Sequence, residues 1–404
     1  MSMKTIWFIN EYAGSPYHGM QFRHYYLGKE LIKYGYNVWI ITASYSHLRH
    51  KQPLESGIEK INGVNYFWIK VNKYSHAHDK KRILKWFIFS IKLFMKFKKL
   101  PKPNYIYVSS PFLLPIVPAY WFKKQFRDLK LIFEVRDIWP LTLIELGGYS
   151  KTHPFVKFLE YLENFALTKA DILVSVLNNF GEYLKDKNIN REWVFLPNGI
   201  SLSSYEEESL PEWFLKKIPR NNFIVAYTGS INISNALDTL METAKLLKER
   251  KDIKFLIVGS GNQLNKLIRF QKMWNLNNVV FINPISRNQV LFFLKKFADV
   301  TYKGSRNSRL YRYGISPLKL FDYMYAKKPI VHAINTKNDL VSQAKCGINV
   351  EAENPKAIAD AILKFYKMPE KERRKIGENG YNFLLKNHTY ERLAKRLVEE
   401  VLYV

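Results

Sequence analysis

Short strand-like runs alternate with helix-like stretches along the whole chain of 404 residues. The runs are rich in β-branched and aromatic residues, whereas the stretches between them repeat apolar residues every three to four positions. This alternation is typical of parallel sheets whose strands are connected by helices. A chain of this length also exceeds the size at which a single hydrophobic core usually stops growing. The sequence therefore predicts an α/β protein with two domains.

The pattern places the elements in two halves. In the first half we expect a helix at 21–34, closed by Gly35, and strands at residues 5–10, 37–42, 64–69, 105–109, 131–134 and 172–175. In the second half we expect helices at 236–250 and 355–366, and strands at 223–228, 254–258, 279–282, 300–302 and 329–332. The interval 197–222 lacks sheet periodicity and contains Pro197, Gly199, Pro211 and Pro219. We interpret it as the junction between two doubly wound domains, each of which would bind ligands at the carboxyl ends of its strands.

Cysteine content and hydropathy bear on the cellular compartment. Cys346 is the single cysteine, so neither a disulfide framework nor a cysteine-based metal site is expected. The first apolar run is short, follows one positive charge and is followed at once by Glu11, which is typical of a first strand rather than a signal peptide. No stretch reaches the roughly 18 apolar residues of a spanning helix. We therefore expect a cytoplasmic protein.

Positive charge is concentrated in one part of the chain. Lys and Arg number 63 against 35 Asp and Glu, and residues 51–130 alone contain 17 basic and 4 acidic side chains. Such clustering favours a polyanion or an anionic membrane surface as partner. The alternative for the more diffuse charge of the second half is a generally basic composition.

The basic cluster includes a predicted amphipathic helix. Residues 80–102 contain nine Lys or Arg and no Asp or Glu, and at 100° per residue Lys81, Lys85, Lys92, Lys96 and Lys99 form one stripe. Apolar residues, Trp86 among them, cover most of the remaining surface. This pattern favours a helix at an anionic membrane surface, with Lys81, Lys85, Trp86, Lys92 and Lys96 as contacts. The alternative is an ordinary domain helix with its apolar side in the core.

The segment 314–324, Gly-Ile-Ser-Pro-Leu-Lys-Leu-Phe-Asp-Tyr-Met, has the strongest chemical signature. Pro317 favours the start of a helix there, and a helix N-terminus offers free backbone amides to an anion. Lys319 falls in the first turn, where it adds a positive charge suited to a diphosphate. Asp322 follows on a neighbouring face and suits the hydroxyls of a ribose. The segment predicts a nucleotide-sugar site.

This segment resembles the donor motif of the retaining family 4 glycosyltransferases, and within it the subgroup that assembles bacterial capsule, O-antigen and exopolysaccharide. The family pattern has two glutamates eight positions apart; here Asp322 stands at the second position and Gly314 at the first. The resemblance implies a GT-B fold, in which two doubly wound Rossmann-like domains face a cleft. It also implies an N-terminal acceptor domain at 1–200, a linker at 201–222, a donor domain at 223–383, and a final helix at 384–404 that returns to the first domain.

Three further loops of the second half match the family's order. The loop Thr-Gly-Ser-Ile-Asn at 228–232 follows a strand, as does the glycine-rich turn at 258–262 and the strand end at 282–285. By resemblance these loops contact the diphosphate and the nucleobase. The family's loop Arg and Lys are absent from 228–232, so Lys319 with Lys303, Arg306, Arg309 or Arg312 is expected to supply the charge. The expected donor-binding residues are Gly229, Ser230, Asn232, Gly259, Ile285, Arg312, Gly314, Ser316, Pro317, Leu318, Lys319 and Asp322.

Two segments of the first half are expected to form the acceptor-binding site. The loop at 14–23 resembles the family's first glycine loop, with Gly19 beside the reacting sugar and Arg23 as an acceptor contact. The Arg-Asp-x-Trp-Pro segment that begins at Arg136 places charges at the end of a buried strand, where they are costly unless paired or functional. We expect Asp137 near the acceptor hydroxyl and Arg136 as an anion contact; an internal Arg–Asp pair is the alternative.

The resemblance implies transfer of a sugar, possibly N-acetylated, from a nucleoside diphosphate to a lipid-linked or glycan acceptor. UDP is favoured as carrier, with GDP open, and the acceptor would be a polyprenyl diphosphate-sugar at the inner face of the membrane. It further implies retention of configuration, with no cofactor besides the nucleotide sugar. The absence of an Asp-x-Asp pair agrees with metal independence. A sugar-nucleotide epimerase on the same fold and a polyanion- or nucleic-acid-binding protein remain as alternatives, although no nucleic-acid-binding motif is present.

Overall fold

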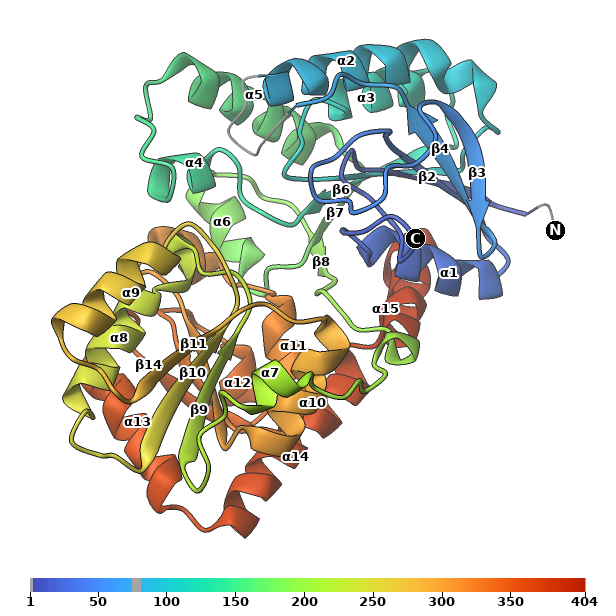
Figure 1. Cartoon of the computed structure of the whole chain (residues 1–404). Helices are drawn as coiled ribbons and strands as arrows, with labels where there is room; N and C mark the ends of the chain where they lie inside the picture. Colours follow the sequence, from blue (N-terminus) through green and yellow to red (C-terminus); the bar gives the residue numbers. More distant parts are fainter. Residues whose placement is uncertain (1–2, 75–80, 404) are drawn as a thin grey trace. The chain divides into compact units, whose positions relative to one another are not determined.

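The computed structural model describes residues 3–74 and 81–403 and divides the chain into two compact units (Figure 1). Unit 1 comprises residues 1–199 and 390–404, and unit 2 comprises residues 200–389. Each unit is built around one sheet with helices on both faces, as the alternation of strands and helices predicts. Lys80 of the predicted basic segment and residue 404 of the predicted final helix lie outside the described residues.

Unit 1 contains an eight-stranded sheet of order β3-β4-β2-β1-β5-β6-β7-β8. The strands are β1 (Thr5–Ile9), β2 (Asn37–Ala43), β3 (Gly57–Ile61), β4 (Val64–Ile69), β5 (Tyr105–Ser109), β6 (Lys130–Val135), β7 (Ile172–Ser175) and β8 (Trp193–Phe195). All neighbours are parallel except β3, which runs antiparallel to β4. In the centre of the sheet, Ile6 of β1 lies between Val38 and Tyr105.

The strand β1 shows how alternation fixes the two faces of this sheet. Ile6 and Phe8 join the core under helices α1 and α15, whereas Trp7 stacks on Phe97 and Phe122 of the opposite face. The helices of unit 1 are α1 (Arg23–Lys33), α2 (Lys81–Lys96), α3 (Ile116–Lys124), α4 (Leu141–Glu145), α5 (Pro154–Lys169), α6 (Phe180–Asp186) and α15 (Tyr390–Leu397), with short helices η1 (Phe97–Lys99) and η5 (Val398–Leu402).

Unit 2 contains a six-stranded parallel sheet of order β11-β10-β9-β12-β13-β14. The strands are β9 (Phe223–Thr228), β10 (Ile253–Val258), β11 (Val279–Ile282), β12 (Val300–Gly304), β13 (Ile330–Ala333) and β14 (Gly347–Val350). Helices α8, α9 and α13 cover one face, and α7, α10, α11, α12 and α14 lie on the other. The doubly wound arrangement expected for both halves is therefore confirmed.

The helices predicted at 236–250 and 355–366 correspond to α8, which ends earlier, at Leu246, and to α13. The helices of unit 2 are α7 (Glu212–Leu215), α8 (Leu237–Leu246), α9 (Leu264–Met273), α10 (Arg287–Phe297), α11 (Leu318–Tyr325), α12 (Leu340–Gln343), α13 (Pro355–Lys367) and α14 (Glu370–Asn387), with the short helices η2 (Leu202–Ser204), η3 (Ile233–Asn235) and η4 (Arg309–Tyr313). Residues 201–222, expected to link the domains, pack within unit 2, where Leu210 and Phe214 belong to its core.

The chain returns to unit 1 after Thr389. The amphipathic helix α15 packs beside α1, and Tyr390 stacks on Tyr26 with ring centroids 5.1 Å apart. Leu393 and Leu397 are fully buried in the same core. Burial of this apolar face anchors the last residues on the first sheet.

Candidate functional site

The candidate site of unit 2 lies at the carboxyl ends of its strands, where four loops meet. The loops after β9 and β10 are in contact: a Cβ on Gly259 would lie 1.9 Å from the carbonyl oxygen of Gly229, and a Cβ on Gly261 would lie 2.2 Å from that of Ile231. Gly229 itself has φ +119°, a conformation that L side chains rarely adopt. Only glycine therefore allows these two loops to pack so closely.

Lys319 joins the loop after β9 to the N-terminus of α11. Its ammonium group donates to the hydroxyl of Tyr227 (2.7 Å) and approaches Oδ1 of Asn235 (3.5 Å). The Tyr227 hydroxyl donates in turn to the carbonyl of Ser230 (2.5 Å). A Cβ on Gly229 would lie 3.2 Å from the Lys319 ammonium. The predicted diphosphate loop and the predicted lysine are thus adjacent, over 80 residues apart in sequence.

The ammonium of Lys319 is held in an apolar and partly cationic environment. Burial lowers the pKa of Lys319 well below its usual range, the charge of Lys303 lowers it further, and Asp322 opposes the shift. The ammonium also lies 4.1 Å from the centroid of the Tyr227 ring. An anion placed beside this side chain would favour its charged form.

Asp322 lies one turn after Lys319 and faces a different set of residues. Its Oδ1 accepts from Nη2 and Nε of Arg287 (2.7 and 3.2 Å) and from the hydroxyl of Tyr205 (2.8 Å). The Arg287 guanidinium lies 4.4 Å from the centroid of the Tyr205 ring. Arg287 and Tyr205 were not predicted from the sequence. A local signal exists for Arg287 alone, in the Ser-Arg-Asn-Gln capping box that opens α10 at Ser286.

Gly314, at the position of the missing first acid, has φ +99°. This left-handed backbone follows η4 and precedes the extended residue Pro317, which caps α11. A glutamate here would be strained, because L side chains disfavour this conformation.

The remaining predicted donor residues surround the start of α11 and the neighbouring strand ends. Ser230, Arg312 and Leu318 are exposed, and Asn232, Ile285, Ser316 and Pro317 are half-buried. The Arg312 guanidinium lies 5.2 Å from the centroid of the Tyr313 ring. Asn232 is fixed within the loop, because its Oδ1 accepts from Asn235 (2.7 Å).

In unit 1, the predicted acceptor loop folds back on itself after β1. A Cβ on Gly14 would lie 1.9 Å from the carbonyl oxygen of Gly19, and Gly19 has φ +119° against the backbone of Arg49. The guanidinium of Arg136 donates to Oε1 of Gln21 (2.7 Å). The structure thereby brings together the loop at Gly19 and the end of β6, the two segments that the sequence singled out.

Asp137 and Arg136 do not pair with each other among the residues that the structure describes. Asp137 is exposed beside the strand end, and its backbone amide donates to the hydroxyl of Ser110 (3.2 Å). The backbone amide of Arg136 donates to the same hydroxyl (2.8 Å). The internal Arg–Asp pair, kept as the alternative, is therefore absent.

Arg23, predicted as an acceptor contact, is instead a structural residue. It is 3% exposed and binds the carboxylate of Glu134 (2.7 Å) together with the carbonyls of Leu196 and Pro197 (2.8 and 2.6 Å). Burial alone would raise the pKa of Glu134, but Arg23, His24 and Arg136 outweigh it and lower this pKa to about 2. The prediction was wrong because the carboxylate partner lies 111 residues away in the sequence.

Lys85 and Trp86 also differ from their predicted place at the surface of α2. Lys85 is fully buried 3.5 Å from the carboxylate of Glu11, and Trp86 is 6% exposed and stacks on Phe155. Lys92 and Lys96 turn toward the sheet edge, where they donate to the carbonyl of Lys70 (2.8 Å) and the hydroxyl of Ser56 (3.2 Å). Lys81 is exposed.

The exposed face of α2 is apolar instead. Phe94 contacts Trp121 of α3 (ring centroids 4.3 Å apart) and Phe87 stacks on Phe158 of α5 (6.2 Å). Each of these side chains is at least 37% exposed. We call this surface the apolar patch; it comprises Leu84, Phe87, Ile91, Phe94, Met95, Val117, Trp121, Phe158 and Tyr161.

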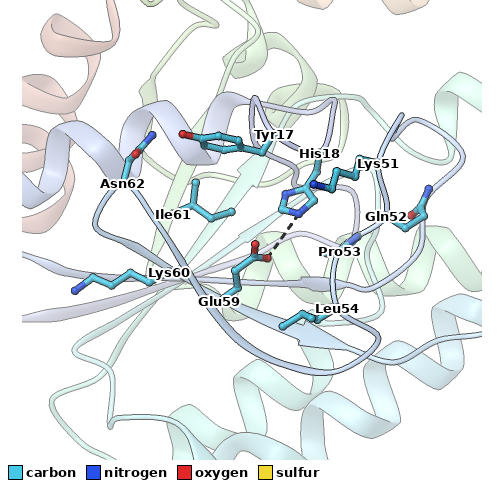
Figure 2. A pocket seen from close by; sticks show the side chains of 10 residues that line it. All are labelled: Tyr17, His18, Lys51, Gln52, Pro53, Leu54, Glu59, Lys60, Ile61 and Asn62. Atoms are coloured by element: carbon cyan, nitrogen blue, oxygen red, sulfur yellow. Dashed lines mark ion pairs between the residues drawn. The ribbon is translucent and has the colours of Figure 1, made fainter.

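A cavity of about 520 Å³ opens beside the acceptor loop (Figure 2). Tyr17 and His18 of this loop face the edge strand β3, where Glu59 lies 3.6 Å from Nε2 of His18. Lys51 and Lys60 add positive charge to the lining. Burial lowers the pKa of His18, and Nδ1 of the ring is hydrogen-bonded to Ser15 (2.9 Å). The cavity offers donors, acceptors and an exposed tyrosine ring.

The described residues contain no group of three or more His, Cys, Asp or Glu side chains that could hold a metal ion. None of the described helices is long and apolar enough to cross a membrane.

Residues 212–383 match the family described as Glycosyl transferases group 1. The range covers nearly all of unit 2. Among curated proteins, an uncharacterized glycosyltransferase of Methanocaldococcus jannaschii is 22% identical over 227 residues, which cover 55% of this chain and 57% of that protein. The match therefore spans little more than half of the relative's length.

Solved structures show the same fold over almost the whole chain. Sucrose-phosphate synthase from Thermosynechococcus elongatus is 16% identical with a TM-score of 0.77, and the alignment covers 99% of this chain and 98% of that one. Anabaena HepE in complex with UDP and glucose is 12% identical (TM-score 0.69; 99% and 100% covered). WaaG, a glycosyltransferase involved in lipopolysaccharide biosynthesis, is 15% identical (TM-score 0.67; 98% and 99% covered). The fold is GT-B, as expected.

Proposed function

Because the second unit matches the group 1 glycosyl transferases, we propose that the protein transfers a sugar from a nucleoside diphosphate to a lipid-linked or glycan acceptor in surface polysaccharide assembly. The observation that carries the proposal is the convergence of Gly229, Gly259 and Lys319 at one end of the second sheet. This arrangement offers close backbone approach and a cation, the two features a diphosphate requires.

The leaving diphosphate is the group that this site would stabilise. The Lys319 ammonium, in the first turn of α11, lies beside Gly229 of the loop after β9. Preorganised donors of this kind lower the barrier by stabilising the charge that develops on the leaving group. We propose that this is how the reaction proceeds without a metal, and with retention of configuration as in family 4.

UDP is the proposed carrier. HepE, which has the same fold, was solved in complex with UDP and glucose. Asp322 would bind the ribose through the carboxylate oxygen that does not face Arg287, since Oδ1 is already bonded to Arg287 and Tyr205.

The acceptor would bind in unit 1. The cavity beside Gly19 has the mixture of polar groups and an exposed aromatic ring that carbohydrates favour, and Asp137 lies exposed at the end of β6. We propose Asp137 as the polar group nearest the attacking hydroxyl and Arg136 as an anion contact.

The apolar patch supports a peripheral position on an anionic membrane, where a polyprenyl-linked acceptor would reside. Exposed apolar side chains of α2 contact those of α3 and α5, and Lys81, Lys98, Lys99, Lys124 and Lys157 are exposed on the same helices or at their ends. Rings and methyl groups at the headgroup boundary, flanked by lysines, are typical of interfacial binding. The apolar side chains thus replace the lysine stripe as the proposed contact.

One assay tests the transfer reaction. The purified protein is incubated with a panel of UDP- and GDP-sugars and a polyprenyl diphosphate-sugar, with and without EDTA, and products are resolved by mass spectrometry. We expect acceptor-dependent release of UDP that EDTA leaves unchanged. Epimerised donor in the absence of acceptor would identify an epimerase instead. Salt-sensitive binding of RNA, with no nucleotide-sugar binding, would identify a polyanion-binding protein.

Vesicle sedimentation tests the membrane surface. Phe87→Ser with Ile91→Ser should weaken binding to phosphatidylglycerol vesicles by roughly tenfold or more, because each side chain removes about 1 kcal/mol of interfacial burial. The matched control is Leu246→Ser with Met273→Ser, two exposed apolar side chains of unit 2. Equal binding of both variants would refute the surface.

A further inference from the structure

Lys303 is a buried lysine without an acidic partner. It precedes Gly304, the last residue of β12, is 5% exposed, and donates to the hydroxyl of Ser305 (3.0 Å) and to the carbonyl of Gly304. No carboxylate pairs with its ammonium group among the residues that the structure describes. A buried charge without a counter-ion is costly, so such groups are either neutral or kept for a ligand.

Lys303 points toward the same helix that carries Lys319. On β12, Tyr302 belongs to the core cluster on the side of α8 and α13, and alternation directs Lys303 to the face covered by α11. The charge of Lys303 acts on the pKa of Lys319, second only to burial. The next residue, Gly304, leaves a Cβ only 3.0 Å from the carbonyl of Asn235, whose side chain approaches Lys319. The end of β12 therefore lies beside Asn235, the residue that the Lys319 ammonium approaches.

Arg306, another candidate for the missing loop charge, is already engaged in hydrogen bonds. Arg306 donates to Asp238 (2.8 Å), to Glu353 (2.8 Å) and to the carbonyl of Ile233 (2.8 Å). Its guanidinium connects three segments at the surface of unit 2, and its positive charge is neutralised by two carboxylates. Lys303 has no comparable partner.

We propose that Lys303 and Lys319 together bind the diphosphate of the donor, and that Lys303 takes up a proton when the donor binds. The proposal rests on the proposed function and adds a residue that the motif at 314–324 does not contain. Two cations on neighbouring elements replace the Arg and Lys of the family's loop.

The expected proton uptake follows from the burial of Lys303. Burial lowers the pKa of Lys303 to about 7, so the side chain is mostly neutral at pH 8 in the free protein. Among its titratable neighbours, His332 is its partner in register on β13 and is bonded to Asp339 (2.6 Å), and Lys319 on α11 is affected by its charge. The negative charge of a diphosphate would raise the pKa of Lys303 and restore its proton.

Calorimetric titration of UDP at pH 8, in two buffers of different ionisation enthalpy, tests the proposal. The wild-type protein should take up on the order of one proton per UDP bound. Lys303→Met should bind UDP roughly 10- to 100-fold more weakly, as expected for loss of a hydrogen bond to a charged group, and should take up less proton. Uridine, which has no phosphate, should bind both proteins equally.

The control variant is Lys272→Met, which removes an exposed lysine from α9 and should leave both readouts unchanged. Thermal unfolding shows that the loss is not misfolding: Lys303→Met should have an equal or higher Tm, because it removes an uncompensated buried charge. Unchanged UDP affinity and proton uptake in Lys303→Met would overturn the role of Lys303 but leave the proposed function standing. A wild-type protein that binds neither UDP nor GDP would overturn the proposed function as well.

Discussion

The two units bury cations near the carboxyl ends of their strands but compensate them differently. In unit 1, Arg23 binds the carboxylate of Glu134 at 2.7 Å and Lys85 lies 3.5 Å from that of Glu11. In unit 2, the ammonium groups of Lys303 and Lys319 contact only neutral oxygen atoms among the described residues. Paired charges of this kind hold the fold, whereas unpaired ones leave room for an anion. We therefore interpret the paired charges of unit 1 as a structural network and the unpaired lysines of unit 2 as part of a binding site.

The largest effect expected from this comparison concerns the paired network. Glu134→Gln should destabilise the protein by about 3–5 kcal/mol, because it leaves the guanidinium of Arg23 buried without its counter-ion. Urea unfolding of the full chain measures the change. Glu212→Gln, which removes an exposed ion pair with Lys216, is the control and should change stability by less than about 0.5 kcal/mol. Equal effects of the two variants would remove the structural role assigned to the network.

Substitution of the unpaired lysines of unit 2 should lower ligand affinity and leave stability undiminished. Lys319→Met should lower the affinity for UDP by roughly 10- to 100-fold, the value of a charge-assisted contact, without loss of stability. Fluorescence or calorimetric titration at pH 7 measures the affinity, and thermal unfolding measures the stability. Retained UDP binding would show that the cation faces no phosphate.

The pH dependence of stability should distinguish the two regions in sign. The pKa of Glu134 is about 2 in the folded protein, so its contribution is present above the unfolded value near 4.5 and is lost as pH falls toward 2. The pKa of Lys303 is about 7, below the unfolded value of 10.5, so stability rises as pH increases from 7 to 10.5. Chemical unfolding between pH 2 and 10.5 should show that Glu134→Gln flattens the acid slope and Lys303→Met the alkaline one. Identical profiles in wild type and variants would contradict both assignments.

The smallest effect is expected at Asp322, which is paired and half-buried. Asp322→Asn should change stability by about 1 kcal/mol or less, because the Arg287 side chain is 38% exposed and solvent screens the pair. If the free carboxylate oxygen binds the ribose, the KM for the donor should rise several-fold while the KM for the acceptor stays constant. Initial-rate measurements with each substrate varied would separate the two, and an unchanged donor KM would leave Asp322 a structural partner of Arg287.

Most strands could be predicted from the sequence because their apolar runs are buried on both faces. The strands β4, β5, β7, β9 and β11 have the predicted limits. The missed strands β3, β8 and β14 lie at sheet edges, where one neighbour is lacking and the burial pattern is mixed. In β3, the polar Glu59 and Lys60 interrupt the apolar pattern that would have identified it.

The candidate site was predicted in part. The glycine turns and the segment at 314–324 carry local signatures, since a loop that approaches another backbone requires glycine. Arg287 and Tyr205 carry none, because they meet Asp322 from positions 35 and 117 residues away. Contacts between residues so far apart in the sequence depend on the order of the strands in the sheet.

The sequence by itself determined the alternation of strands and helices, the two parallel sheets and the place of the glycine turns, because period and backbone conformation are local properties. The tertiary structure alone decided which charges are compensated. The 3.6-residue period predicted the stripe of Lys85 and Lys92 on α2, but Glu11 beyond β1 draws Lys85 inward and turns Phe87 and Ile91 to the surface. At the other sheet, no carboxylate of residues 3–74 and 81–403 pairs with Lys303. The sequence shows that a lysine carries a charge, whereas the packing of distant segments determines which counter-ion, if any, lies beside it.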